Sequence, residues 1–330
     1  MSNRATEPNG NGRSRARVVF FGMRCAFSAP PLEALIQAGY DLPALVLPGR
    51  PGAEAVVQRV SRRGATVGLP TAGQHPLASI DRLAVDADIP VLEVSDLKSG
   101  AALNVLQELE PDVIAVACFR WRIPSRVRVL PRLGSLNVHP SLLPRWRGPE
   151  PLFWTFKAGD LKAGTTVHLM DDGFDTGPIV RQEHVPLASG VDGLTLEQEL
   201  AELGGRLLVE AIDGLAMGRL TPAPQDDALA TTAPMPNDAD LMVDLNQPAR
   251  RVFEFVRGVA PLWGPLPFRS PNFDEFVLVD GTLAFDPDAT QDAPIIRDGA
   301  VINARCNPGV VRLAICESGG CDALTPVAPV

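Results

Sequence analysis

The sequence predicts an α/β protein with a doubly wound, Rossmann-like, mostly parallel sheet and a smaller C-terminal β-barrel domain of the OB-like kind. Continuous apolar runs such as residues 112–118 (DVIAVAC) are typical of parallel strands covered on both faces. Segments with helical periodicity alternate with these runs, as in a doubly wound sheet. Residues 276–315 instead form short strand-like runs separated by DG, DP and NPG turns, which favours a small barrel.

The elements of the first domain follow in order along the chain. A strand over residues 18–22 ends in a glycine turn, and Ser28 is expected to cap a helix that stops at Gly39. Residues 42–47 form the second strand, and residues 48–80 form a long loop rich in Gly, Arg and Ser. Ser99 is expected to cap the next helix, and Thr195 with Gln198 forms a capping-box pattern at the start of a long one.

Composition sets the domain organisation and the broad class. The 330 residues suit about two domains, and no apolar run is long enough for a transmembrane helix. We expect a disordered tail (1–16), a catalytic domain (17–220), a linker (221–240) and a C-terminal domain (241–330). The polar N-terminus has no apolar secretory segment, so a reducing cytoplasm is the expected location.

The five cysteines are scattered along the chain. Cys25, Cys118 and Cys306 stand in apolar surroundings and are expected to be plain core residues. Cys316 and Cys321 could pair or bind a metal, although no histidine lies near them to complete a zinc site. No metal site is therefore expected.

Three polar residues mark a candidate site in the stretch between residues 135 and 180. Asn137 and His139 are two apart at the end of a short strand, so their side chains leave the same face. Asp175 follows 36 residues after His139 in a glycine-rich loop that ends a second strand. A strand–helix–strand unit between them should return the chain to the same edge of the sheet, where the three groups can meet.

An amide, an imidazole and a carboxylate together suit acyl transfer through a tetrahedral intermediate. The amide and the imidazole can donate to a developing oxyanion, and the carboxylate can take a proton from an attacking amine. The chain has no G-x-S-x-G elbow and no cysteine close to His139, which argues for direct attack by the amine. Each residue alone is more often structural: Asn137 or His139 as a buried hydrogen-bonding group, and Asp175 as a turn residue.

The complete stretch favours a catalytic role for these residues, because it resembles the formyltransferases that use 10-formyltetrahydrofolate. The matching motif is N-x-H-x-SLLP, here residues 137–144, followed by the aspartate of a D-x-G-x-D-like loop, here residues 171–175. The resemblance extends from about Arg17 to Gly218, and PRLGSLNVH and SLLPRWRG are most similar to the branch that formylates methionyl-tRNA. Pro140 and His168 instead resemble the purine-pathway branch, and FFGM resembles the sugar-nucleotide branch.

The resemblance implies specific roles. Asn137 and His139 would polarise the formyl oxygen, Asp175 would orient the histidine and relay the proton, and Thr166 would support the site by hydrogen bonding. 10-Formyltetrahydrofolate would be the co-substrate, and its binding residues would come from three short segments. These residues are Arg122, Ile123 and Pro124; Ser141, Leu142, Leu143 and Pro144; and Asp171, Asp172 and Gly173.

The acceptor amine is left open by the sequence. From Thr231 to Val330 there are seven arginines, no lysine and thirteen acidic residues, which is unlike an RNA-binding surface. The basic candidates lie elsewhere, at Arg59, Arg62, Arg63, Arg145 and Arg147. Initiator methionyl-tRNA is the leading acceptor, and an amino-sugar nucleotide or another small amine is the alternative. A folate hydrolase and a non-catalytic folate-binding protein are the remaining hypotheses, and no membrane partner is expected.

Overall fold

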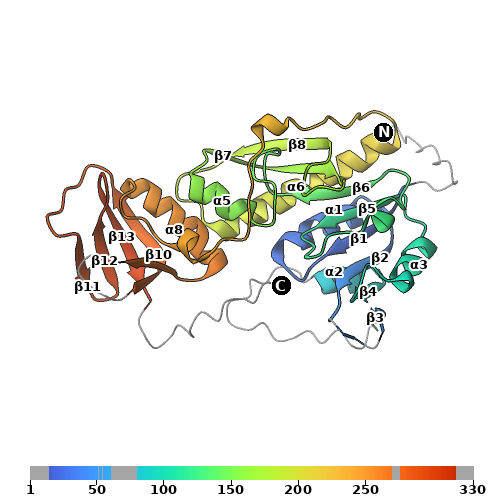
Figure 1. Ribbon diagram of the computed structural model, residues 1–330, viewed down its shortest axis with the longest axis horizontal. Coiled ribbons are helices and arrows are strands. Elements are labelled where there is room, and N and C mark those ends of the chain that lie inside the picture. The colour runs from blue at the N-terminus through green and yellow to red at the C-terminus, as the bar shows by residue number, and fades with distance from the viewer. Residues whose placement is uncertain (1–14, 51, 54, 61–79, 270–275, 317–330) are drawn as a thin grey trace, which may run out of the picture. The chain divides into compact units, whose positions relative to one another are not determined.

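The computed structural model describes residues 15–50, 52–53, 55–60, 80–269 and 276–316 (Figure 1). Residues 1–14 of the expected tail, most of the loop at 48–80 with Arg62 and Arg63, and Cys321 therefore lie outside the described residues. Ala16, at the end of the expected tail, is buried. The chain divides into two compact units. One comprises Met1–Arg147, Gly164–His184 and Gln198–Ala230, and the other comprises Gly148–Ala163, Val185–Glu197 and Thr231–Val330.

An eight-stranded mixed sheet in the order β3-β4-β2-β1-β5-β6-β7-β8 confirms the α/β class (Figure 1). The pairs from β4 to β6 are parallel, whereas β3 pairs antiparallel with β4 and β6 pairs antiparallel with β7. The strands are β1 (Arg17–Gly22), β2 (Asp41–Pro48), β3 (Val57–Val60), β4 (Val91–Val94), β5 (Val113–Ala117), β6 (Ser135–His139), β7 (Lys162–Leu169) and β8 (Ile179–Pro186).

The buried strands β1 and β5 form the centre of this sheet. All five residues of β5 are buried, as its continuous apolar run predicts. From β1 the strand order runs to β2 on one side and to β5 on the other, so the chain reverses its winding direction between β1 and β5. Open α/β sheets bind their ligands outside the carboxyl ends of the strands near such a reversal.

The helices of the chain alternate with these strands. They are η1 (Ala26–Ser28), α1 (Ala29–Gln37), α2 (Ile80–Asp86), α3 (Gly100–Glu108), α4 (Ser125–Arg128), α5 (Pro151–Ala158) and α6 (Gly193–Ala216). Two adjacent glycines allow α6 to pack closely. A Cβ on Gly204 would lie 2.5 Å from Val138 of β6, and a Cβ on Gly205 would lie 2.9 Å from Ala34 of α1.

The predicted cap of α3 is confirmed, since Ser99 Oγ accepts from Ala102 N at 3.1 Å. Ser28 occupies the predicted N-cap position of α1, but its side chain does not cap the helix, because the hydroxyl is turned inward and donates to the carbonyl of Ala117 of β5 at 2.7 Å. The predicted capping box of Thr195 and Gln198 is wrong. Thr195 lies inside α6, where Asp192 Oδ1 accepts its backbone N–H at 2.9 Å, so the acidic residue one turn earlier supplies the cap.

Two features of the sheet also differ from the sequence prediction. Residues 57–60 of the expected loop form β3, which adds an edge strand beside β4. The unit between Asn137 and Asp175 is not a parallel crossover, since β7 runs antiparallel to β6. His139 and Asp175 are nevertheless brought together, because β7 is the direct neighbour of β6 and the chain folds back after it.

The C-terminal part forms a separate five-stranded antiparallel sheet in the order β11-β12-β13-β10-β9. Its strands are β9 (Leu266–Arg269), β10 (Phe276–Asp286), β11 (Ile295–Asp298), β12 (Val301–Arg305) and β13 (Val310–Ile315). Helix α8 (Ala249–Trp263) packs against β10 and β13 (Figure 1). Of the predicted turns, Asp298–Gly299 separates two strands, whereas Asp280–Gly281 lies within β10 at an irregularity of its pairing.

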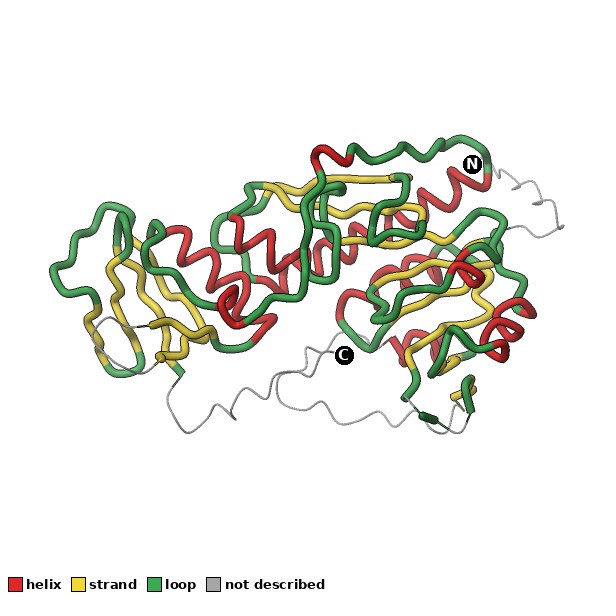
Figure 2. The backbone as a smooth tube through the Cα atoms, viewed as in Figure 1, coloured by secondary structure: helices red, strands yellow, loops and turns green. Residues whose placement is uncertain are grey.

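Between α6 and α8 the chain is mostly irregular, interrupted by η2 (Asp227–Leu229) and α7 (Asp238–Leu241) (Figure 2). The boundaries expected from the sequence for the tail (1–16), the catalytic domain (17–220), the linker (221–240) and the C-terminal domain (241–330) stay predictions. Among the described residues, no helix is both long and apolar enough to cross a membrane.

Candidate active site

The end of strand β6 presents the first two candidate residues. Asn137 and His139 leave the same face of β6, as their spacing predicts. In the antiparallel ladder with β7, Asn137 lies opposite His168 and His139 lies opposite Thr166. Directly opposed residues on one face of such a pair are close neighbours. The ladder therefore adds a second histidine and a threonine to the predicted pair.

The loop after β7 carries Asp175. Asp171 Oδ1 accepts from Gly173 N at 3.0 Å and from Thr176 Oγ1 at 2.6 Å, which closes the loop on itself. Gln225 Nε2 donates to the carbonyls of Asp175 and Gly177 at 2.7 Å each. The φ angle of Asp175 is +54°, in the left-handed region that non-glycine residues rarely adopt. The surrounding hydrogen bonds thus hold the carboxylate in a backbone conformation that is otherwise unfavourable.

Asn137, His139, His168 and Asp175 form one cluster in the structure. Asn137 Nδ2 donates to Asp175 Oδ1 at 3.2 Å and lies 3.2 Å from His168 Nε2. Asp175 Oδ2 is 3.7 Å from His139 Nδ1, and Oδ1 is 3.4 Å from His168 Nε2. The Asp175 side chain is only 16% exposed, so these interactions are poorly screened by solvent. The carboxylate therefore has an imidazole on each side.

The second ring nitrogen of His139 points into a neighbouring turn. Its Nε2 hydrogen-bonds the carbonyl of Trp146 at 2.8 Å, and since a carbonyl can only accept, Nε2 carries the proton. Burial lowers the pKa of His139, opposed by the nearby charge of Asp175. A formyl oxygen that took a hydrogen bond from Nε2 would replace the Trp146 carbonyl as acceptor.

Thr166 supports the turn that follows His139. Its hydroxyl donates to the carbonyl of Ser141 at 2.6 Å and accepts from the backbone N–H of Leu143 at 3.2 Å. Gln182 Nε2 also donates to it, at 2.8 Å. Ser141 Oγ donates in turn to the carbonyl of Arg145 at 2.7 Å. The predicted supporting residue therefore acts on the backbone of the 141–145 turn, and its hydroxyl is fully engaged there.

The predicted folate-binding segments at 122–124 and 171–173 contact each other. The Arg122 guanidinium donates to the carbonyl of Asp172 and lies 5.4 Å from the centre of the Phe174 ring. Arg128 Nη2 pairs with Asp172 Oδ1 at 2.7 Å, and this hydrogen bond lowers the pKa of Asp172. Phe174 is 68% exposed. Its exposed ring and the Arg122 side chain offer a surface on which a flat aromatic ligand could stack.

Three of the five predicted basic residues, Arg59, Arg145 and Arg147, lie in the described part of the chain. Arg147 donates to Gln225 and pairs with Asp227 at 2.8 Å, so its charge is largely neutralised locally. The Arg145 guanidinium stacks 4.2 Å from the centre of the Trp146 ring. Arg59 lies on the edge strand β3. Arg62 and Arg63 lie outside the described residues.

Two residues beside Asp175, His168 and Gln225, are not among the predicted site residues. His168 resembles another branch of the family, and its position two residues after Thr166 on a strand places both on one face. Gln225 reaches the Asp175 loop from the segment after α6, and no local pattern signals that contact. The first residue could have been found from strand alternation, whereas the second required the tertiary structure.

Of the three cysteines predicted to be core residues, Cys306 is buried as predicted, whereas Cys25 is half-buried and Cys118 is exposed. A hydrogen bond from Cys118, opposed by burial, lowers the pKa of the Cys25 thiol to about 6. Burial raises the pKa of Cys306 to about 11. Cys316 is disulfide-bonded, and the described residues contain no group of three or more His, Cys, Asp or Glu side chains that could hold a metal.

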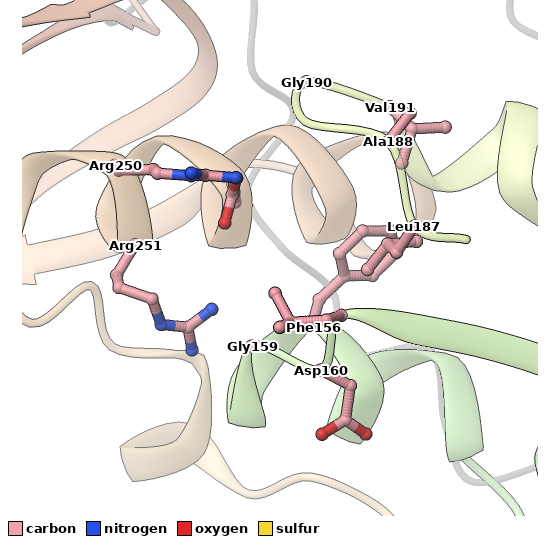
Figure 3. A pocket seen from close by; sticks show the side chains of 11 residues that line it. Phe156, Gly159, Asp160, Leu187, Ala188, Gly190, Val191, Arg250 and Arg251 are labelled. Atoms are coloured by element: carbon pink, nitrogen blue, oxygen red, sulfur yellow. The ribbon is translucent and has the colours of Figure 1, made fainter.

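A small pocket lies in the second unit, and none of its lining residues is a predicted site residue (Figure 3). It is lined by the end of α5, the 187–191 loop and the start of α8. Its polar groups bind one another: Arg250 pairs with Glu254 at 2.8 Å, and Arg251 donates to the carbonyl of Lys157 at 3.0 Å. The pocket therefore shows structural hydrogen bonding and no group arranged for catalysis.

The sequence of the chain is similar to those of known formyltransferases. Residues 50–212 match the family described as formyl transferase. The chain is 36% identical over 248 residues to the methionyl-tRNA formyltransferase of Pelobacter propionicus, covering 75% of this chain and 72% of that protein. It is 34% identical over 310 residues to the enzyme of the same name from Bordetella pertussis, covering 92% and 95%.

Solved structures share the fold at low sequence identity. An N-formyltransferase from Helicobacter canadensis, in complex with folinic acid and dTDP-3-aminofucose, gives a TM-score of 0.64 at 13% identity, over 90% of this chain and 98% of that one. HypX from Aquifex aeolicus, in complex with tetrahydrofolic acid, gives a TM-score of 0.59 at 15% identity, over 91% of this chain and 43% of that one.

Proposed function

Because the chain belongs to the formyltransferase family, we propose that it transfers the formyl group of 10-formyltetrahydrofolate to an amine, with initiator methionyl-tRNA as the acceptor. The observation that carries the transferase chemistry is the cluster of Asn137, His139 and Asp175, whose polar atoms lie within 3.7 Å of the carboxylate. The acceptor is proposed from the names of relatives that align over most of their length. Such an acceptor would place the reaction in the cytoplasm.

In this proposal the three residues serve successive parts of one transfer. The amine attacks the formyl carbon, and the oxygen that gains negative charge accepts hydrogen bonds from Asn137 and His139. Asp175 takes the proton that the amine loses. The Arg122 and Phe174 surface beside the Asp171–Gly173 loop would hold the folate ring system.

A small amine is the alternative acceptor, favoured by the acidity of the C-terminal region. Residues 231–330 carry thirteen acidic side chains against seven arginines, which would repel RNA phosphates. A protein of similar fold was solved with an amino-sugar nucleotide, dTDP-3-aminofucose. An amino-sugar nucleotide has two phosphates and needs far less basic surface than tRNA does.

One assay separates these functions. The protein is incubated with 10-formyltetrahydrofolate, and tetrahydrofolate release is measured without acceptor, with charged initiator tRNA, and with a panel of amino-sugar nucleotides. We expect rapid release only with the tRNA, and an apparent KM for tRNA that rises steeply with salt. Asp175→Asn is the matched inactive control for background hydrolysis.

Each other outcome contradicts a defined part of the proposal. Tetrahydrofolate release only with an amino-sugar nucleotide would show that this compound, and not tRNA, is the acceptor, while the formyl-transfer chemistry would stand. Tetrahydrofolate release that is as fast without an acceptor as with one would identify a 10-formyltetrahydrofolate hydrolase. Tetrahydrofolate binding without turnover in every arm identifies a non-catalytic folate-binding protein.

A further inference from the structure

Two cysteines lie side by side where strands β1 and β5 end, and the proposed transfer chemistry uses neither of them. The two strands are parallel neighbours, with Gly22 of β1 paired to Ala117 of β5. Cys118 follows Ala117 directly, and Cys25 stands in the turn that leaves β1. Cys118 is exposed, Cys25 is half-buried, and a hydrogen bond joins the two thiols. A second sulfur therefore lies within contact distance of Cys25.

The turn after β1 stabilises the thiolate form of Cys25. Cys25 is the N-cap residue of η1, and the backbone N–H groups of Phe27 and Ser28 donate to its sulfur. Ser28 Oγ lies 3.4 Å from the same atom. The hydrogen bond from Cys118 is the largest cause that lowers the pKa of Cys25 to about 6, and burial opposes it. The thiolate is the form of cysteine that attacks electrophiles.

The charges around Cys25 favour a small, uncharged electrophile. The neighbouring Arg24 pairs with Asp81 at 2.9 Å and with Glu93 at 2.7 Å, so its charge is taken up by two carboxylates. Within the described part of the chain, the groups that shift the pKa of Cys25 are Cys118, Ser28 and the Phe27 amide, and none of them is a cation. An anionic oxidant would find no partner charge here, whereas hydrogen peroxide needs none.

We propose that Cys25 and Cys118 form an oxidation site for hydrogen peroxide, which links them by a reversible disulfide. The Cys25 thiolate attacks one peroxide oxygen and the O–O bond breaks, so that Cys25 becomes a sulfenic acid and the other oxygen leaves as water with the proton that the thiol had released. The Cys118 sulfur then attacks the Cys25 sulfur. The S–S bond forms, the S–O bond breaks, and hydroxide leaves with the Cys118 proton as water. Two thiols lose two electrons in total, and one peroxide is reduced to two water molecules.

The disulfide would act on a segment that is predicted to bind folate. Cys118 begins the loop that leads to residues 122–124. Forming the bond draws Cys118 toward Cys25, because hydrogen-bonded sulfurs lie farther apart than bonded ones. The other neighbour of β5 is β6, whose end carries Asn137 and His139. We therefore expect oxidation to slow turnover; this effect rests on the proposed formyl transfer, whereas the disulfide itself does not.

The first experiment treats the full-length protein with hydrogen peroxide, removes the peroxide, and maps the peptides by mass spectrometry without reduction. We expect a cross-link between Cys25 and Cys118 in the wild type and in Cys306→Ser, the control at a buried cysteine. In Cys118→Ser the reaction should stop at the sulfenic acid of Cys25, which dimedone traps. Cys25→Ser should give neither product. Absence of the cross-link in the wild type, or of the sulfenic acid in Cys118→Ser, overturns the proposal.

The second experiment measures turnover of the same samples in the formyl-transfer assay. Oxidation should lower kcat of the wild type by about tenfold or more, and Cys25→Ser treated in the same way should keep its rate within about twofold. Dithiothreitol should restore the wild-type rate. An unchanged kcat once the cross-link has formed overturns the link to the folate segment. If the reduced protein transfers formyl groups to no acceptor, the proposed function fails, and the peptide map still decides the oxidation site.

Discussion

The Nε2 atom of His139 donates a hydrogen bond of 2.8 Å to the backbone carbonyl of Trp146, which fixes the proton of the neutral imidazole on that nitrogen. The other ring nitrogen, Nδ1, faces Asp175 Oδ2 at 3.7 Å. One backbone carbonyl thus decides which atom of the histidine is a donor toward the turn and which is an acceptor toward the carboxylate.

Asp175→Asn is expected to lower kcat by about 10²- to 10⁴-fold while the protein still folds and binds tetrahydrofolate. The amide has nearly the shape of the carboxylate, keeps the hydrogen bond that Gln225 donates to the backbone carbonyl, and cannot take a proton. Steady-state kinetics and equilibrium folate binding are the measurements. Turnover near that of the wild type would show that Asp175 is not the proton acceptor.

His139→Ala and Asn137→Ala are expected to act mainly on kcat, each by about 10²- to 10⁴-fold. Both side chains are proposed to donate to an oxygen whose negative charge develops only in the transition state. Measuring kcat and KM separately distinguishes this role from substrate binding. An increase in KM at unchanged kcat would make the two residues binding groups.

His139 should also destabilise the fold in mild acid. Burial lowers its pKa in the folded protein, so below the unfolded value of 6.5 the unfolded chain takes up a proton that the folded protein resists. The free energy of unfolding should therefore fall as the pH drops from about 6.5 toward the folded pKa. His139→Gln should flatten this part of the curve, measured by urea unfolding at several pH values. The exposed His184→Gln should keep the wild-type slope; an unchanged slope in His139→Gln would refute the assignment.

Glu150 should destabilise the second unit as the pH rises to neutral and above. Burial, with a smaller contribution from Glu197, raises its pKa from 4.5 to about 7. The folded state then favours the protonated form, so its stability falls as the pH rises from about 4.5 through 7. Glu150→Gln should raise stability by about 3 kcal/mol at pH 8 and by little at pH 4. The exposed Glu108→Gln is the control, and equal effects of both variants at pH 8 would contradict the prediction.

Cys25 should react with iodoacetamide at neutral pH. The hydrogen bond from Cys118 lowers the pKa of its thiol to about 6, so the thiolate predominates at pH 7. The buried Cys306, with a pKa raised to about 11, should stay unmodified in the native protein and serves as an internal control. Mass spectrometry of the alkylated protein over a pH series gives the profile. Cys118→Ala should move the midpoint for Cys25 upward, and an unchanged midpoint would exclude that hydrogen bond.

The amino-acid sequence alone predicts which apolar segments are buried strands and which polar groups stand at the candidate site. The apolar runs at β1, β2 and β5 are confirmed as buried strands, since burial on both faces demands uninterrupted apolar sequence. The spacing of Asn137 and His139 fixed their common face because strand side chains alternate with a period of two. Ser99 was found because a helix cap is a contact between close neighbours in the chain.

Tertiary structure alone decided the direction of β7, the inward turn of Ser28 and the presence of His168 beside Asp175. A polar side chain such as Ser28 or Thr195 bonds whichever partner packing brings near, and that partner can be distant in sequence. The antiparallel pairing of β6 and β7 places His168 opposite Asn137, and Gln225 then holds the Asp175 loop from a segment 50 residues away. These contacts depend on the pairing of remote strands and segments, which no local pattern of residues encodes.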